Sequence, residues 1–152
     1  MTFTEAEIKE KLGKKFPKTE KIYEIIPVVI ATPKVEFLEE EDRMQISLAA
    51  SVEIPFSKKY DVSVIFVSGV RYEPKDKTLR LSKLEVKEIK ATDLPENYAK
   101  PMATLASALS KKYLKDQKVY ELKPKDFKNK AARMLIKKVE VKEKQLQVTF
   151  GL

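Results

Sequence analysis

The clearest pattern in the chain is a strict alternation of apolar and polar positions between residues 43 and 54. Met44, Ile46 and Leu48 begin a series of apolar residues at every even position that continues to Ile54, while the odd positions are mainly polar. Alternation with a period of two places the apolar side chains on one face of a β-strand and the polar ones on the other. The segment is therefore predicted to be a long strand with one buried face and one face in water.

Two further strands are predicted on the C-terminal side of this one. The first covers residues 60–72, and a turn leads from it into the second, over residues 79–89. In the second strand the apolar phase shifts from Leu81 to Leu84 and again before Ile89. Because each shift moves the apolar set to the opposite face, we expect bulges or bends in a strongly curved sheet.

Prolines shape the prediction for the apolar stretch at residues 22–38. Pro27 and Pro33 lack the backbone N–H that a central strand donates to its neighbour. This stretch is therefore predicted to be an edge strand or a bent one. The acidic cluster at residues 39–42 is predicted to be the hairpin turn that connects it to the alternating strand.

Helical spacing is found in three places. Thr4 and Glu7 match a capping box and predict a helix over residues 5–15. Residues 95–115 carry apolar side chains in steps of three and four, which predicts one long amphipathic helix. A shorter helix is predicted over residues 124–136. The stripe of the long helix is Tyr98, Met102, Leu105, Leu109 and Tyr113, and that of the shorter helix is Phe127, Ala131 and Leu135.

A short strand over residues 119–122 and a hairpin over residues 139–150 complete the predicted elements. Strands in long runs, followed by helices, indicate the α+β class. We expect a single domain over residues 1–152, with a strongly curved antiparallel β-sheet, one long α-helix, and short N- and C-terminal helices.

The composition argues against catalysis. The 152 residues include no histidine and no cysteine, so the commonest general base and the commonest ligands of structural zinc are missing. The carboxylates form no recognisable pair for acid–base chemistry, and three glycines make no phosphate-binding loop. We therefore expect a protein that is not an enzyme and that uses no cofactor and no metal.

The net charge of +8 is concentrated in the last quarter of the chain. Residues 1–110 carry 18 basic and 18 acidic side chains, whereas residues 111–152 carry 13 and 5. Only four of the 31 basic residues are arginine, the side chain best suited to reading bases and phosphates. A solvated lysine surface is the plain interpretation. An anionic lipid or membrane surface comes next, and nucleic acid is not expected as a partner.

Several strings of residues resemble the YceB-like bacterial lipoproteins, an uncharacterised family. Residues 3–8 resemble the family's opening segment, and residues 71–92 resemble its central hairpin and acid-rich strand. Residues 105–122 are similar to its long helix and following strand, and residues 131–150 to its final helix and hairpin. The resemblance covers nearly the whole chain and consists of patterned apolar positions.

The resemblance implies a fold and a location. The family is similar to the tubular lipid-binding (TULIP) superfamily, in which a highly curved antiparallel sheet wraps a long helix and the groove between them takes up acyl chains. Its members are exported and tethered to a membrane through a lipidated cysteine before the opening helix. The resemblance therefore implies a periplasmic protein whose lipidated N-terminal cysteine is absent from this sequence, or a cytoplasmic one if Met1 is the native start.

These observations lead to the hypothesis of a non-enzymatic periplasmic protein that binds a lipid or another apolar ligand between sheet and long helix. C-terminal lysines are expected to contact anionic head groups or membrane surfaces. The predicted groove residues are Ile46, Leu48, Val64, Phe66, Met102, Leu105 and Leu109, and the predicted surface-contact residues are Lys111, Lys112, Lys137 and Lys138.

Two other interpretations remain open at this stage. One is a protein-interaction or membrane-surface adaptor whose interior is fully packed. The other is nucleic-acid binding, which predicts an affinity that falls steeply with salt. Core residues and groove residues are both apolar and face inward, so the sequence does not separate them, and it leaves the oligomeric state open.

Overall fold

The computed structural model describes residues 1–127 and 135–151, and most of these residues lie in strands. The strands are β1 (Thr2–Phe3), β2 (Lys18–Ile22), β3 (Ile26–Ile30), β4 (Lys34–Leu38), β5 (Arg43–Glu53), β6 (Lys59–Glu73), β7 (Thr78–Ala91), β8 (Lys118–Glu121), β9 (Leu135–Lys142) and β10 (Gln145–Gly151). The α-helices are α1 (Glu5–Gly13) and α2 (Ala99–Leu109), with 3-10 turns at Glu39–Glu41, Glu96–Tyr98 and Pro124–Phe127 and a π-helical segment at Ser110–Leu114.

The large sheet is antiparallel and curls into a half-barrel. Its strand order is β2-β3-β5-β6-β7-β8, and β4 pairs with β5 beside this path. The same edge of β5 thus serves two partners, since Ala50–Val52 pair with β3 and Arg43–Ser47 pair with β4. The predicted strand over residues 22–38 is therefore two short strands, β3 and β4, preceded by the last residue of β2, and Pro33 lies in the break between β3 and β4.

The alternation in β5 is confirmed, because its even-numbered side chains from Met44 to Val52 are buried and its odd-numbered ones are partly or fully exposed. Opposite residues on β6 continue the buried layer, with Ile46 paired to Phe66 and Leu48 to Val64. All four of these side chains are 0% exposed. The inner face of the half-barrel is built by this layer.

The predicted bulges are also confirmed. The register between β6 and β7 shifts between Ile65 and Phe66 and again between Val67 and Gly69, and β7 supplies the additional residue each time. Lys83 lies at the second shift and has a φ of 52°. An extra residue on one strand bends and twists the pair, which accounts for part of the sheet's curl.

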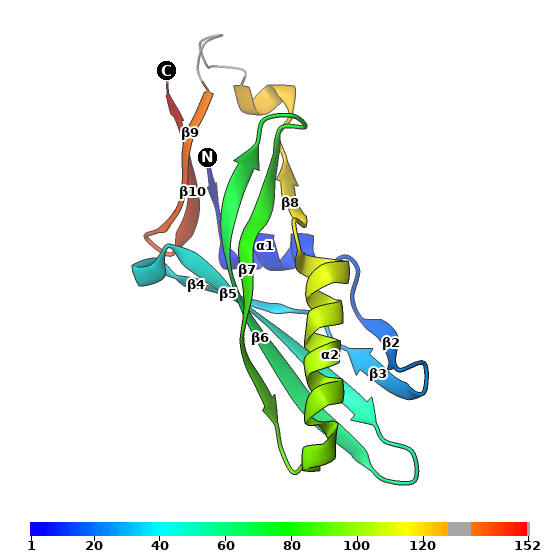
Figure 1. The fold of residues 1–152 in the computed structure, drawn as a ribbon. Coiled ribbons are helices and arrows are strands. Elements are labelled where there is room, and N and C mark those ends of the chain that lie inside the picture. The colour runs from blue at the N-terminus through cyan, green and yellow to red at the C-terminus, as the bar shows by residue number, and fades with distance from the viewer. Residues whose placement is uncertain (128–134, 152) are drawn as a thin grey trace.

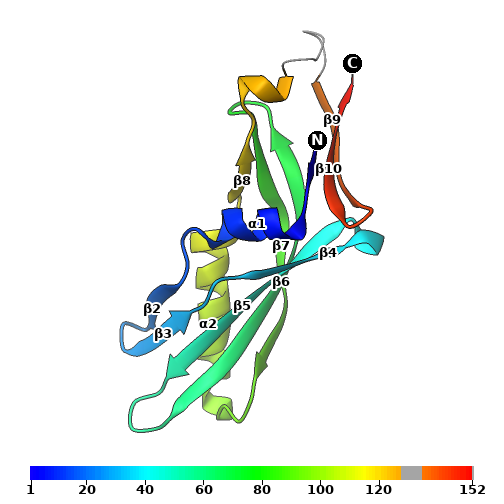
Figure 2. The ribbon, with the colours of Figure 1, turned by 180° about the vertical axis from the view of Figure 1, so that it is seen from behind.

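The expectation of a sheet wrapped around one long α-helix is wrong. The α-helical part of the predicted helix covers only Ala99–Leu109, and it passes into the π-helical segment Ser110–Leu114. This helix lies across the concave side of the half-barrel, where it packs against β2 and β7 (Figures 1 and 2). Most of the core is made by strands, so the fold is mainly β and the predicted α+β class is also wrong.

The predicted C-terminal helix over residues 124–136 is also wrong where the structure describes it. Pro124–Phe127 forms a 3-10 turn, and Leu135 and Ile136 already belong to β9, where they pair with Gly151 and Phe150. Ala131 lies outside the described residues. The apolar pair at 135 and 136 fits a helical stripe and a buried strand equally well, which explains the error.

A second, three-stranded sheet has the order β1-β10-β9 and stands beside the upper part of β5 and β6 (Figure 1). The predicted terminal hairpin is thereby confirmed. The backbone N–H of Val141 in β9 donates a hydrogen bond to the Asp42 carboxylate at 2.6 Å, which links this sheet to the β4–β5 turn.

The N-terminal helix begins with the predicted capping box. The Glu7 backbone N–H donates to Thr4 Oγ1 at 3.2 Å, and the Thr4 backbone N–H donates to Glu7 Oε1 at 3.1 Å. The buried Ile8 and Leu12 attach α1 to the core. The helix ends at Gly13, so the lysines that follow it lie beyond its last turn.

Candidate functional site

The seven predicted groove residues all lie in the hydrophobic core. The four from β5 and β6 are 0% exposed, and Met102, Leu105 and Leu109 are 2%, 3% and 1% exposed. They belong to one continuous cluster that also includes side chains of the small sheet. The structure thus places all seven in one hydrophobic core, with Ile46 opposite Phe66 and Leu48 opposite Val64.

A hollow of about 350 Å³ opens beside α2, at the edge of this core. Leu105 and Leu109, one helical turn apart, face it from α2, and Ile22 faces it from the end of β2. Its lining is Glu20, Lys21, Ile22, Tyr23, Thr104, Leu105, Ala108, Leu109, Lys111, Lys112 and Tyr113. Two predicted groove residues and two predicted lysines therefore meet at one place.

Local sequence explains the shape of this hollow. Ala108 has a side chain of a single carbon, which leaves room beside Leu105 and Leu109 on the helix surface. On the opposite wall, β2 turns into β3 through Tyr23 and Glu24, with φ values of 52° and 61°. This tight turn keeps Tyr23 57% exposed at the rim.

The polar wall of the hollow is centred on Glu20. The Tyr113 hydroxyl donates a hydrogen bond to the Glu20 carboxylate, and Lys112 Nζ lies 3.1 Å from it. The hydrogen bond from Tyr113, and then the contact with Lys112, hold the pKa of Glu20 below its ordinary value. Burial, followed by the bond to this carboxylate, raises the pKa of Tyr113 to about 12.

The predicted surface-contact lysines differ in whether a carboxylate pairs with them. Lys112 is paired with Glu20, whereas Lys111 is an exposed cation at the rim with no ion pair among the described residues. Lys137 and Lys138 lie on β9, in the other sheet. Lys138 is paired with Glu140 at 2.9 Å, and the bond to this carboxylate raises the pKa of Lys138.

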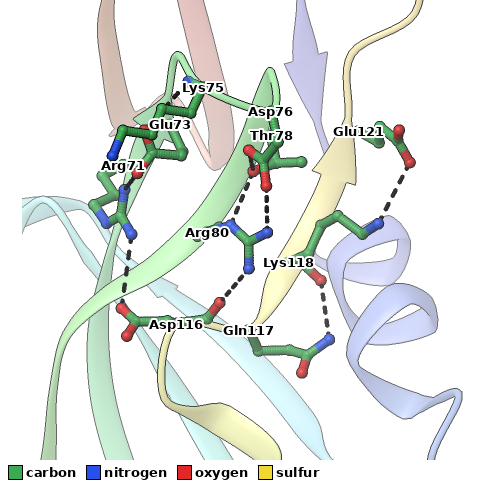
Figure 3. Close-up of polar contacts among 10 residues, drawn as sticks. All are labelled: Arg71, Glu73, Lys75, Asp76, Thr78, Arg80, Asp116, Gln117, Lys118 and Glu121. Atoms are coloured by element: carbon green, nitrogen blue, oxygen red, sulfur yellow. Dashed lines mark hydrogen bonds and ion pairs between the residues drawn. The ribbon is translucent and has the colours of Figure 1, made fainter.

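A network of charged side chains joins the β6–β7 hairpin to the segment before β8 (Figure 3). Arg80 donates to Asp76, to Thr78 and to the backbone carbonyl of Asp116. Arg71 lies 3.2 Å from Glu73. Since each guanidinium faces a carboxylate of its own, we interpret this network as one that holds the hairpin to β8.

The loop between β5 and β6 exposes an aromatic side chain. Phe56 is fully exposed and has a φ of 62°, and Lys58 and Lys59 follow it. Lys58 Nζ lies 5.3 Å above the ring of Tyr60. This loop is at the end of the molecule farthest from the two termini (Figure 1).

No group of three or more carboxylates in the described part of the chain is arranged to hold a metal ion. No helix in that part is both long and apolar enough to cross a membrane.

A family model matches residues 3–145, and that family is described as a protein of unknown function, DUF1439. The chain belongs to the DUF1439 family. No curated protein matches the sequence. The match covers nearly the whole chain of this DUF1439 protein.

Sequence reasoning missed part of the hollow in this DUF1439 protein. Glu20, Ile22 and Tyr23 meet α2 only after the half-barrel curls, because they come from a hairpin more than eighty residues earlier in the chain. A single acidic residue among lysines gives no signal of its own. Ala108 lies outside the apolar stripe of the predicted helix, so the stripe gave no indication of the room beside it.

Proposed function

We propose that this protein binds a lipid with one acyl chain and an anionic head group, without catalysing a reaction. The acyl chain occupies the hollow beside α2, against Leu105 and Leu109. The head group lies at the rim near Lys111. The proposal includes the periplasmic location and the membrane tether that the YceB-like resemblance implies.

The observation that carries this proposal is that apolar side chains and lysines left unpaired in the described part of the chain line the same hollow. Its floor is apolar, and its rim holds Lys21 and Lys111, which no carboxylate of the described residues pairs. A volume of about 350 Å³ lies at the lower end of the range for small-molecule sites. An acyl chain placed there gains about 0.8 kcal/mol per methylene removed from water.

Native mass spectrometry of protein purified without detergent tests the proposal, with lysophosphatidylglycerol as the anionic probe and lysophosphatidylcholine as the zwitterionic one. We expect a one-to-one complex with the anionic lipid. Ala108→Phe fills the hollow and abolishes the complex, while Ala99→Phe, at the exposed start of α2 and outside the hollow, leaves it unchanged. A mass that never shifts with added lipid contradicts the proposal.

A second candidate function is attachment to an anionic membrane surface, for which a packed interior is sufficient. Phe56 favours it, since a fully exposed aromatic ring followed by Lys58 and Lys59 suits the boundary between head groups and acyl chains. Co-sedimentation with phosphatidylglycerol vesicles tests this candidate. Phe56→Ser should release the protein, and Val29→Ser, which removes an apolar side chain that is 50% exposed on β3, should not.

A further inference from the structure

A second hollow, of about 480 Å³, lies between the C-terminal end of α1 and strand β8. The chain segments that form it are about a hundred residues apart in sequence. It is lined by Lys11, Leu12, Lys14, Lys15, Gln117, Lys118, Val119, Tyr120, Glu121, Lys123 and Lys125. Six of these side chains are lysines and one is a carboxylate.

Little of this positive charge is neutralised within the hollow. Glu121 lies 3.4 Å from Lys118, and Lys15 donates a hydrogen bond to Gln117. In the described part of the chain, no carboxylate is at ion-pair distance from the remaining four lysines, which are Lys11, Lys14, Lys123 and Lys125. Figure 3 shows the Lys118 and Glu121 side chains projecting on the side of β8 where α1 lies.

The acidic residues next to the hollow, Asp116 and Asp126, bind other groups than its lysine side chains. The Asp126 carboxylate accepts hydrogen bonds from the Tyr120 hydroxyl at 2.9 Å and from the Lys123 backbone N–H at 2.7 Å. Asp116 faces the arginines of the β6–β7 hairpin (Figure 3). These contacts leave the hollow with an excess of cations.

Helix stabilisation explains only some of these lysines. Lys11 lies in the last turn of α1 and Lys14 caps it, where a positive charge interacts favourably with the helix dipole. Lys123 and Lys125 follow β8 and belong to no α-helix. Their convergence on the end of α1 brings like charges together, which destabilises the fold unless an anion lies between them.

We propose that this hollow binds a compact anion carrying several phosphate groups. Lysine ammonium groups suit phosphate oxygens as point charges, and several on one concave wall match a clustered charge. An extended nucleic-acid strand fits less well, because the Tyr120 ring is partly buried and already packs 4.8 Å from the Phe3 ring. This site is separate from the hollow beside α2 and stands whether or not that hollow binds lipid.

Isothermal titration calorimetry with sodium tripolyphosphate tests the proposal. We expect saturable one-to-one binding that K11Q/K14Q/K123Q weakens by about tenfold or more. The matched control K9Q/K34Q/K87Q removes the same charge from exposed positions outside the hollow and should change the affinity less than about twofold. Equal losses in the two triple variants, or no saturable binding, overturn the proposal.

Two further experiments test the charge of the hollow and the source of the phosphate. Glu121→Gln removes the one carboxylate of the lining and should strengthen tripolyphosphate binding. Vesicles containing phosphatidic acid distinguish the source of the phosphate. If K11Q/K14Q/K123Q alone loses vesicle binding, the phosphate belongs to a lipid head group, and if neither triple variant differs from wild type on vesicles, it belongs to a free anion.

Discussion

The Tyr113 hydroxyl donates a hydrogen bond to the Glu20 carboxylate and so joins the π-helical segment after α2 to strand β2. The Tyr113 ring also packs at 5.2 Å from the ring of Phe16, just before β2. These two contacts hold the polar wall of the hollow beside α2 in place. Both the shape of that hollow and part of the fold's stability therefore depend on this pair.

Removing the Tyr113 hydroxyl should destabilise the protein in a pH-dependent way. Tyr113→Phe is expected to lower the free energy of unfolding by about 1–2 kcal/mol at pH 7, because a bond to an ionised carboxylate is lost. The pKa of Glu20 is lowered in the folded state, so this stability is present above its ordinary value of 4.5 and is lost as pH falls below it.

Urea unfolding at pH 7 and at pH 3 measures this difference. It should shrink at the lower pH, where Glu20 takes up a proton. Tyr23→Phe, at an exposed position, serves as the control and should have little effect at either pH. A Tyr113→Phe deficit that is the same at both pH values would show that the charge of Glu20 is not involved.

Tyr113 and Tyr120 should ionise only at high pH, above the ordinary pKa of tyrosine. Burial first, and then the bond to a carboxylate, raise the pKa of Tyr113 and that of Tyr120 to about 12. Their contribution to stability is present below pH 10 and is lost as pH rises from 10 to 12. Absorbance at 295 nm should therefore rise near pH 12, and Tyr113→Phe should reduce that step. Loss of amplitude near pH 10 instead would contradict the assignment.

Truncation at Phe66 distinguishes a packed interior from an open groove. Phe66 is 0% exposed between β5 and the rest of the core, so Phe66→Ala should cost about 3–5 kcal/mol of unfolding free energy. Val29→Ala, on the exposed side of β3, should stay within about 0.5 kcal/mol. Urea denaturation measures both, and a cost below about 1 kcal/mol for Phe66→Ala would indicate space around that ring.

A glycine at the second bulge of β7 should be tolerated or favourable. Lys83 has a φ of 52°, a conformation that costs free energy for a residue with a Cβ atom. Its carbonyl, which accepts a hydrogen bond from Arg43 at 2.7 Å, is kept in Lys83→Gly. We expect thermal unfolding to show that Lys83→Gly raises the free energy of unfolding by about 0.5 kcal/mol. Lys87→Gly, at the first bulge, should lower it by about as much. Equal losses would show that backbone strain is absent at Lys83.

The strands were predictable from the sequence because a period-two pattern fixes which face is buried. The alternation from Met44 to Val52 predicted the buried face of β5, and the phase shifts around Leu84 predicted the bulges of β7. The extent of α2 was not predictable, since Tyr98 and Tyr113 continue the helical spacing while the backbone there is 3-10 or π-helical.

The two hollows were beyond the reach of a linear pattern. Each depends on the convergence of distant segments, as Glu20 with Tyr113 and Lys14 with Lys123 illustrate. The predicted groove residues were correctly expected to face inward. The end of the curved sheet decides which of these residues lie at an edge of the core. The spacing of apolar residues along the sequence does not predict where the sheet ends.

The pairing of β1 with β10 has a consequence for the order of folding. Phe3 lies opposite Leu146, so β1 pairs with a strand that is made more than 140 residues later in the sequence. All strands of the large sheet precede residue 122, so they can pair with one another before β10 has been made. We therefore expect β1 to lack its strand partner until β10 has been made, and the small sheet to form after the strands of the half-barrel have paired.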